Sequence, residues 1–243
     1  GSQRRGFAYM RHWDGRRWHT VASPGSTATI QLHAVATATR TQTAWAVGAL
    51  GPRRHPSDGH GFALRWEGGR WRRVHVPLVA GELYDVTAHG DGLWVVGADE
   101  RDGALSMRRA DGRWHVVRPP GTDAPLTVVA SQPRGDVWAA IYDDIYRRRD
   151  GRWRRVRTME HAALIDLTFT SPTEAWVVGG GESGGEWYVP FSMRRVRSSW
   201  SVVPLPAVED ASAIVAVDGT PHDVWAVGNP IGYGGPSTAY HYC

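Results

Sequence analysis

Two short phrases centred on tryptophan recur along the chain, and this repetition constrains the fold more than any other feature of the sequence. The first phrase, in copies such as ADGRWHVV and RDGRWRRV, aligns on Trp18, Trp71, Trp114, Trp153 and Trp200. The second phrase, in copies such as AWAVGAL and LWVVGAD, aligns on Trp45, Trp94, Trp138, Trp176 and Trp225. Successive copies lie 38 to 53 residues apart, a period that is typical of a solenoid, a propeller or an array.

Each repeat contains four short runs with strand character, separated by turn residues, and no helical period. In the second repeat these runs are LYDVTAH, LWVVG, ALSMRRA and RWHVVRP. The Asp-Gly pair before the last run supplies the two positive-φ residues of a tight hairpin turn. Five such units predict an all-β fold: a five-bladed β-propeller with four antiparallel strands per blade, formed by residues 1–243 as a single domain. The ten repeated tryptophans are then expected to pack between adjacent blades.

The phrase that is predicted to form the third strand of a blade, such as ALSMRRA, occurs at both ends of the chain. There are therefore six copies of this third-strand phrase for the third strands of five blades. FAYMRHWDG stands near the N-terminus and TAYHYC ends the chain. We expect the ring to be closed by the N- and C-terminal strands joined in one blade. If TAYHYC lies outside the ring instead, Cys243 is free to pair with another molecule, so the chain is expected as a monomer or as a dimer linked by Cys243.

The two phrases resemble the tryptophan-rich WDGxxW and WAVG repeats of actinobacterial β-propellers, and more loosely the tachylectin-like five-bladed lectins. The resemblance covers nearly the whole chain. It implies the five-bladed architecture and says little about activity, because such repeats are mostly scaffold.

Composition narrows the classes of partner. The 28 basic residues are all arginine, the net charge is +4 and the pI is about 9.6. Arginine doublets such as Arg108-Arg109 and Arg154-Arg155 are typical of a solvated face that protects a sheet edge, so no nucleic-acid partner is expected. No run of eighteen apolar residues is present, so no membrane partner is expected. Cys243 is the one cysteine, which excludes an internal disulfide framework and a cysteine-cluster metal site.

The loops between the second and third strands differ greatly from blade to blade, whereas the turns at the opposite end stay nearly constant. They run from YDD in the third repeat to ALGPRRHPSDGHG in the first. Binding residues concentrate on loops held by a rigid scaffold. The divergence predicts one asymmetric site near the central channel, while the alternative is that these loops are tolerated surface insertions.

Alignment of the first strands gives the candidate residues of the channel. One column reads Ala34, Asp85, Val128, Asp166 and Val215, and its neighbour reads His33, Tyr84, Thr127, Ile165 and Ile214. Carboxylates in an otherwise apolar column are costly unless they are paired or hydrogen-bonded. Asp85 and Asp166 are therefore either an acid–base pair or acceptors for the backbone of a neighbouring blade. The candidate catalytic residues are Asp85, Asp166, His33, Tyr84 and Glu82.

The rim of the same site is predicted from the long loops and from one first-strand residue. Trp187 and Tyr188 belong to neither tryptophan series and are candidates for stacking against a planar ligand or a sugar. Arg54 and Tyr233 lie in other long loops, and Gln31 precedes His33 at the mouth of the channel.

The sequence thus predicts a propeller with one small-molecule site, either a binding protein or an enzyme of the acid–base or template type, with natural-product metabolism as one setting. It contains no nucleophile elbow, no phosphate-cradling loop and no zinc-binding helix, so we expect neither a cofactor nor a bound metal. Two alternatives stay open. A multivalent lectin would use equivalent pockets between blades, and a protein-interaction platform would use the divergent face.

Overall fold

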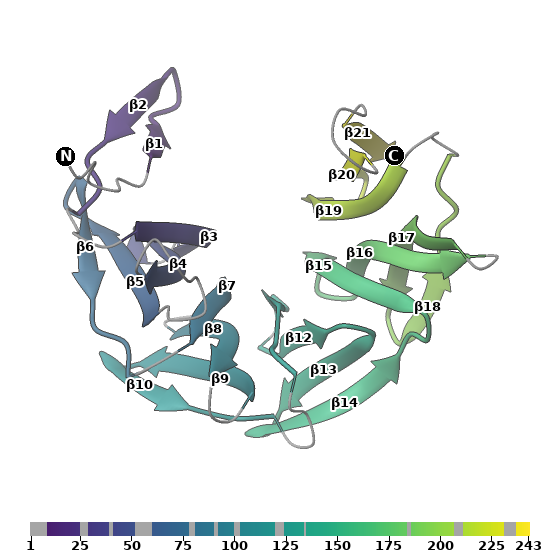
Figure 1. The fold of residues 1–243 in the computed structure, drawn as a ribbon, viewed down its shortest axis with the longest axis horizontal. Helices are drawn as coiled ribbons and strands as arrows, with labels where there is room; N and C mark the ends of the chain where they lie inside the picture. The colour runs from purple at the N-terminus through teal and green to yellow at the C-terminus, as the bar shows by residue number, and fades with distance from the viewer. Residues whose placement is uncertain are drawn as a thin grey trace. The chain divides into compact units, whose positions relative to one another are not determined.

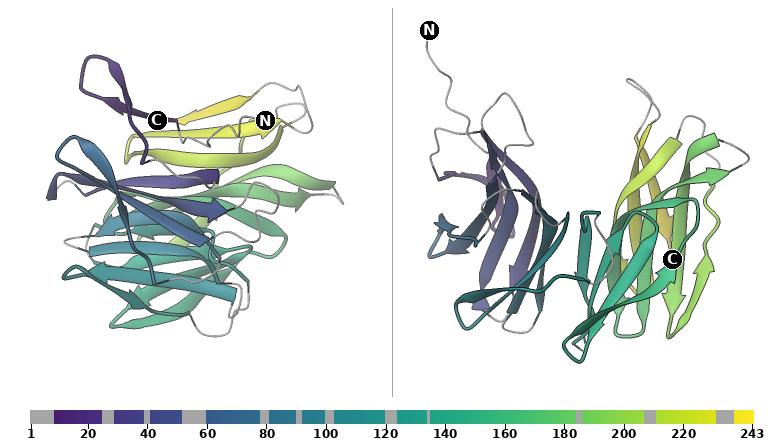
Figure 2. Two further views of the ribbon diagram at one scale, coloured as in Figure 1. Left: turned by 60° about the vertical axis from the view of Figure 1, so that its left-hand side comes forward. Right: turned by 60° about the horizontal axis from the view of Figure 1, so that its bottom comes forward.

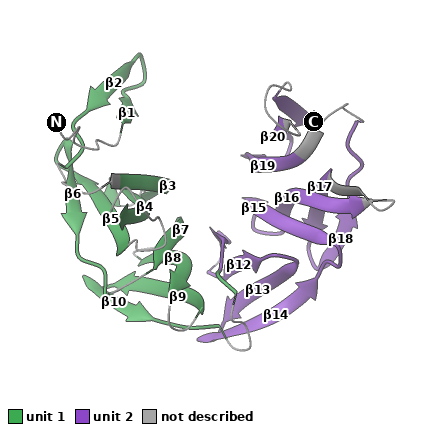
Figure 3. Cartoon of the chain, viewed as in Figure 1, with its two compact units in different colours: residues 1–125 green, residues 126–243 purple. Residues whose placement is uncertain are grey.

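The computed structural model describes residues 9–24, 29–38, 41–51, 60–77, 81–89, 92–99, 103–119, 124–133, 135–183, 186–206, 211–230 and 237–243. The chain divides into two compact units, residues 1–125 and residues 126–243 (Figure 3). Strands β1 to β10 belong to unit 1 and strands β11 to β21 belong to unit 2 (Figure 1).

Unit 1 contains a two-stranded hairpin and two four-stranded antiparallel sheets, each ordered as its strands follow in the chain. The hairpin consists of β1 (Met10–Trp13) and β2 (Trp18–Val21). The first sheet consists of β3 (Thr29–Ala38), β4 (Thr43–Gly51), β5 (His60–Glu67) and β6 (Arg70–Val74). The second sheet consists of β7 (Glu82–His89), β8 (Gly92–Asp99), β9 (Gly103–Ala110) and β10 (Arg113–Val116).

Unit 2 contains two further four-stranded sheets and a three-stranded sheet, stacked face to face (Figure 2). The first consists of β11 (Val128–Ser131), β12 (Val137–Ile141), β13 (Asp144–Arg149) and β14 (Arg152–Thr158). The second consists of β15 (Ala162–Ser171), β16 (Glu174–Ser183), β17 (Glu186–Val196) and β18 (Ser199–Val202). The third consists of β19 (Ala211–Thr220), β20 (Asp223–Pro230) and β21 (Thr238–Tyr242).

These antiparallel sheets are the blades of a β-propeller, so the predicted fold class is confirmed. The turn that joins the third and fourth strands also has the predicted chemistry. Asp111 and Gly112 have φ values of 51° and 75°, and Asp150 and Gly151 have φ values of 50° and 79°. Because each pair forms a two-residue loop with positive φ at both positions, it matches the right-handed twist of the strands it joins.

Tryptophans of the two phrases pack against each other between neighbouring sheets. Trp114 lies edge-on to Trp45 of the preceding sheet, with ring centroids 6.2 Å apart. Trp200 lies in the same way against Trp138, at 6.5 Å. The exceptions to the predicted packing are Trp18 and Trp225, which are 62% and 51% exposed.

The arginine doublets do more than solvate an edge, which corrects the expectation from composition. The guanidinium of Arg109 lies 5.0 Å from the ring centre of Trp45, and that of Arg195 lies 4.8 Å from the ring centre of Trp138. Each arginine belongs to the sheet that follows its tryptophan, so a cation–π contact accompanies the aromatic one at both interfaces.

The C-terminal third-strand phrase takes the place beside β20, since β21 pairs with β20 in antiparallel register from Gly228↔Thr238 to Val224↔Tyr242. The N-terminal copy forms β1, which pairs with β2 and packs on the first sheet of unit 1, where Met10 joins a core cluster with Phe62 and Leu64. Cys243 is exposed and carries a free thiol. Closure of the ring by strands from both termini, the single-domain assignment and the monomer-or-dimer expectation stay predictions.

Candidate functional site

The first strands of four sheets share a bulge at the same place. The ladder with the second strand skips one residue between Leu32 and Ala34, between Leu83 and Asp85, between Leu164 and Asp166, and between Ile214 and Ala216. The skipped residues are His33, Tyr84, Ile165 and Val215. A bulge leaves its extra residue outside the ladder and re-aims its side chain, which is why bulges are frequent next to active sites.

The bulge explains the glycine that ends the WAVG phrase. A Cβ on Gly97 would lie 2.0 Å from the backbone oxygen of Glu82, and a Cβ on Gly48 would lie 1.8 Å from that of Gln31. The third repeat has Ile141 at this place, and the ladder of β11 with β12, which ends at Val128↔Ala140, contains no bulge. Glycine is therefore required wherever the first strand bulges towards the second.

The observed register confirms that Asp85 and Asp166 are equivalent positions, because each pairs with the valine two residues after the second-strand tryptophan. The fifth member of their column is Ala216, not Val215 as the alignment predicted. The alignment slipped by one residue because the number of positions from this column to the tryptophan varies: it is nine between Ala216 and Trp225 and ten between Asp166 and Trp176.

His33 and Tyr84, the first two bulge residues, lie side by side in unit 1. Their rings are stacked, with centroids 5.7 Å apart and planes inclined by 21°. Nδ1 of His33 is 2.9 Å from the backbone oxygen of Leu83. A carbonyl oxygen only accepts, so Nδ1 carries the hydrogen, and in the neutral ring the lone pair is on Nε2. The side chain of His33 is exposed, so Nε2 can meet a ligand.

Asp166 is held by backbone groups of two sheets. Its Oδ1 accepts a hydrogen bond from the N–H of Leu167 and its Oδ2 accepts one from the N–H of Val217 in β19, both at 2.8 Å. Burial raises the pKa of Asp166, and the two hydrogen bonds oppose that rise. This arrangement favours the structural alternative for Asp166 over an acid–base role. Asp85 makes the matching local bond, from the N–H of Val86 to Oδ1 at 2.7 Å.

The other predicted residues divide between the same strands and different places. Gln31 and Glu82 occupy equivalent positions on β3 and β7, beside the bulges. The backbone of Trp187 and Tyr188 belongs to β17, paired with β16, so the predicted long loop of the fourth repeat is largely an extension of the hairpin. Arg54 and Tyr233 lie outside the described residues.

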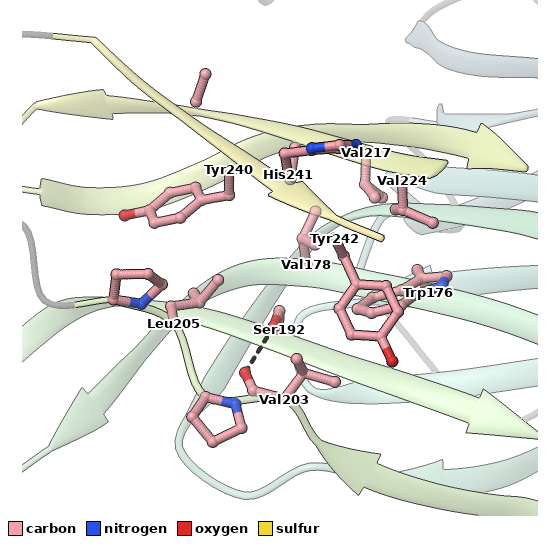
Figure 4. A pocket seen from close by; sticks show the side chains of 14 residues that line it. Trp176, Val178, Ser192, Val203, Leu205, Val217, Val224, Tyr240, His241 and Tyr242 are labelled. Carbon is pink, nitrogen blue, oxygen red and sulfur yellow. Dashed lines mark hydrogen bonds between the residues drawn. The ribbon is translucent and has the colours of Figure 1, made fainter. Parts of the chain in front are cut away.

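Unit 2 contains an apolar pocket of about 250 Å³ that sequence reasoning missed (Figure 4). Its walls include Trp176, Val178 and Leu205 on one side and Tyr240 and Tyr242 of β21 on the other. The centre of the Tyr242 ring lies 4.9 Å from that of Trp176. Tyr242 thus contacts a second-strand tryptophan, as Trp114 contacts Trp45 and Trp200 contacts Trp138 at the other interfaces. The sheet β19–β20–β21 has no fourth strand among the described residues. Tyr242 therefore covers Trp176, and the remaining space that a fourth strand would fill forms the pocket.

The described residues include no group of three histidine, cysteine, aspartate or glutamate side chains placed to hold a metal ion. No helix in the described ranges is long and apolar enough to cross a membrane.

No protein-family model matches the sequence, and no curated protein matches it. Several solved structures do. Selenomethionine-substituted virginiamycin B lyase from Staphylococcus aureus aligns with 86% of this chain and 69% of its own, with a TM-score of 0.59 and 15% identity. A streptogramin B lyase aligns with 86% of this chain and 65% of its own, with a TM-score of 0.61 and 13% identity. A catalytically inactive histidine-to-alanine variant of the S. aureus lyase, solved with quinupristin, gives a TM-score of 0.58 at 15% identity.

These similarities show the β-propeller fold alone. At 13 to 15% identity they assign no activity to this chain, and the matched region is about two thirds of each lyase. Site residues must therefore be argued from the geometry described above.

The column beside the carboxylates contained three of the four bulge residues, His33, Tyr84 and Ile165, and had Ile214 in place of Val215. Sequence reasoning missed the pairing of His33 with the Leu83 carbonyl, because that contact depends on how β3 and β7 stack. The apolar pocket had one signal in the sequence. There are six third-strand phrases and five hairpin tryptophans, and the last third-strand phrase, TAYHYC, is not followed by such a tryptophan.

Proposed function

We propose that the chain binds a small molecule at the bulged first strands of unit 1, and that His33 exchanges a proton with it. The observation that carries the proposal is the fixed tautomer of the exposed His33, whose Nδ1 hydrogen is donated to Leu83, which leaves the lone pair of the neutral ring on Nε2. A histidine oriented in this way by a backbone carbonyl is prepared to act as a general base through its other nitrogen.

The surroundings of His33 support a ligand site over a packing role. Tyr84 supplies an aromatic face against which the imidazole is stacked, and Gln31 and Glu82 add polar side chains on the same two strands. The four bulge residues differ in kind, since His33 and Tyr84 are polar while Ile165 and Val215 are aliphatic. Equivalent lectin pockets would present equivalent residues, so this asymmetry favours one site.

The comparisons supply a first panel of ligands. The similar structures are lyases named for virginiamycin B and streptogramin B, and one of them loses activity when a histidine is replaced. We include quinupristin in the panel for this reason, together with simple sugars and aromatic metabolites.

Calorimetric titration of the panel against wild type, His33→Gln and His115→Gln tests the proposal. His115 is an exposed histidine on β10 and serves as the matched control. We expect one ligand per chain, affinity lowered at least tenfold in His33→Gln, and no change in His115→Gln. A stoichiometry near five, unchanged in His33→Gln, would replace the proposal with a multivalent lectin.

Turnover is tested on any ligand that binds, by mass spectrometry of the reaction mixture. Elimination by proton abstraction gives product whose total mass equals that of the ligand, whereas hydrolysis adds one water. Loss of product with His33→Gln but not with His115→Gln would support His33 as the catalytic residue. Product formed equally by both variants would exclude that role.

A further inference from the structure

A second hollow in unit 2, separate from the first-strand bulges, is lined mainly by arginine. It has a volume of about 530 Å³ and lies between the sheets β11–β14 and β15–β18, at the end of the sheets where the first strand turns into the second. Its cationic lining consists of Arg147, Arg148, Arg149, Arg195 and Arg197. Asp136 and Asp150 are its acidic residues, so positive charges exceed negative ones by three.

Arg195 is the most unusual of these residues. Only 8% of it is exposed, and its guanidinium lies over Trp138 at 4.8 Å from the ring centre. Its Nη1 is buried and has no hydrogen-bond partner among the described residues. An unsatisfied buried donor is costly, and more so when it is charged, so an acceptor that reached this guanidinium would be bound favourably.

The acidic residues nearby do not neutralise the whole group. Asp136 accepts from Nε of Arg147 at 2.8 Å, and Asp150 lies 3.8 Å from Nε of Arg149. Neither Arg195 nor Arg197 forms a salt bridge within the described part of the chain. The pKa of Arg195 is lowered, first by burial and then by the positive charge of Arg147, as expected for a desolvated guanidinium beside another cation.

The walls of the hollow are fixed by hydrogen bonds between its turns. The N–H of Arg197 donates to the carbonyl oxygen of Thr173 at 2.6 Å, and Arg197 has a positive φ of 57°. The side-chain amide of Gln132 donates to the carbonyl oxygen of Pro172, which joins the two sheets across the hollow. The arginines therefore stand on a preformed frame.

The interface between the sheets of unit 1 shows that stacking alone does not require this cluster. Arg109 lies over Trp45 as Arg195 lies over Trp138, and it is likewise partly desolvated. There, however, the neighbouring Arg65 is 3.5 Å from Glu67, and the turn residue that corresponds to Arg197 is Asp111, which has a similar φ and the opposite charge. The additional arginines are thus a property of the hollow in unit 2.

We propose that this hollow binds the phosphate group of a small phosphorylated molecule, with Arg195 and Arg197 as its principal ligands. Guanidinium groups bind phosphate through paired N–H donors in a planar fork. A phosphate monoester carries about −1.5 to −2 charges near neutral pH, which fits the excess of three positive charges. The volume exceeds that of a phosphate and lies in the range of sites for small molecules, about 300–1,000 Å³.

Calorimetric titration with inorganic phosphate and with glucose 6-phosphate, in chloride buffer of constant ionic strength, tests the proposal. We expect one site per chain, and we expect Arg197→Gln to reduce the affinity at least tenfold. Arg197 is exposed, and its matched control is Arg152→Gln, at an exposed arginine of β14 outside the hollow. Arg195→Gln should abolish binding, whereas Arg109→Gln removes the equivalent stacked arginine of unit 1 and should leave binding intact.

The outcomes distinguish the sources of the phosphate group. Tighter binding of glucose 6-phosphate than of inorganic phosphate would assign the site to a phosphorylated metabolite, and equal binding would assign it to free phosphate. No binding of either at millimolar concentration, or equal weakening by Arg197→Gln and Arg152→Gln, would overturn the proposal. A single-stranded oligonucleotide that binds while glucose 6-phosphate does not would overturn the small-ligand assignment.

Discussion

At the scale of single residues, the glycine of the WAVG phrase gives the sharpest prediction. Gly97→Ala would bring a Cβ to 2.0 Å from the Glu82 oxygen, so the first strand must move. We expect a loss of about 1–3 kcal/mol in the free energy of unfolding, as for other overpacked sites. Urea denaturation measures it. Gly181→Ala, where a Cβ would come no closer than 3.1 Å to the backbone oxygen of His161, is the control and should cost less, and an equal loss in both variants would contradict the role of the bulge.

Asp166 predicts a pH dependence of stability. Its pKa is raised in the folded protein by burial, so the folded state holds the proton more tightly than the unfolded state does. The stability that this proton contributes is present below the ordinary aspartate pKa and is lost as the pH rises through the raised value. Asp166→Asn removes the titration, so the melting temperature of wild type relative to the variant should increase as the pH falls from 7 towards 4. A constant difference over that range would rule out this titration.

At the scale of strands and turns, we expect the free energy of unfolding to depend on which residue occupies the positive-φ position of the Asp-Gly hairpins. Asp111 has a φ of 51°, a conformation that aspartate and glycine tolerate better than alanine does. Asp111→Ala should therefore lower the free energy of unfolding by about 1 kcal/mol, measured by urea denaturation. Asp111→Gly is the control and should cost less than the alanine variant. Equal costs would attribute the effect to the carboxylate and not to the turn.

The same elements show how far sequence reasoning reaches. The turns, the second strands and the equivalence of Asp85 with Asp166 were predictable, because each depends on local residue chemistry and a fixed side-chain period. The fifth column member was wrong, since the turn between the first and second strands varies in length between repeats, and one residue more or less shifts the alignment of the first strand. The arginines were misread because only the stacking of neighbouring sheets brings Arg195 over Trp138. The contact of His33 with Leu83 could not be predicted either, because it depends on how β3 and β7 of neighbouring sheets pack together.

At the scale of the whole molecule, each unit has apolar clusters of its own. In unit 2 one cluster, from Val128 to Met193, joins the sheets β11–β14 and β15–β18, and a second cluster contains Trp176, Ile214 and Val224. Sheets of three or more strands that cover one another's apolar faces meet the requirement for independent stability. The repeats thus build units by stacking, and the phosphate hollow lies wholly within one of them.

This organisation predicts that residues 126–243 fold when they are expressed alone. The fragment retains both clusters of unit 2, so we expect β-sheet circular dichroism, a near-ultraviolet tryptophan signal and a cooperative thermal transition. A shorter fragment, residues 162–243, is the control. It loses Val128, Trp138 and Ile145 from the first cluster, and so exposes one face of β15–β18 and should not unfold cooperatively. If neither fragment folds, the core of unit 2 depends on residues 1–125, and the stability of the chain belongs to the propeller as a whole.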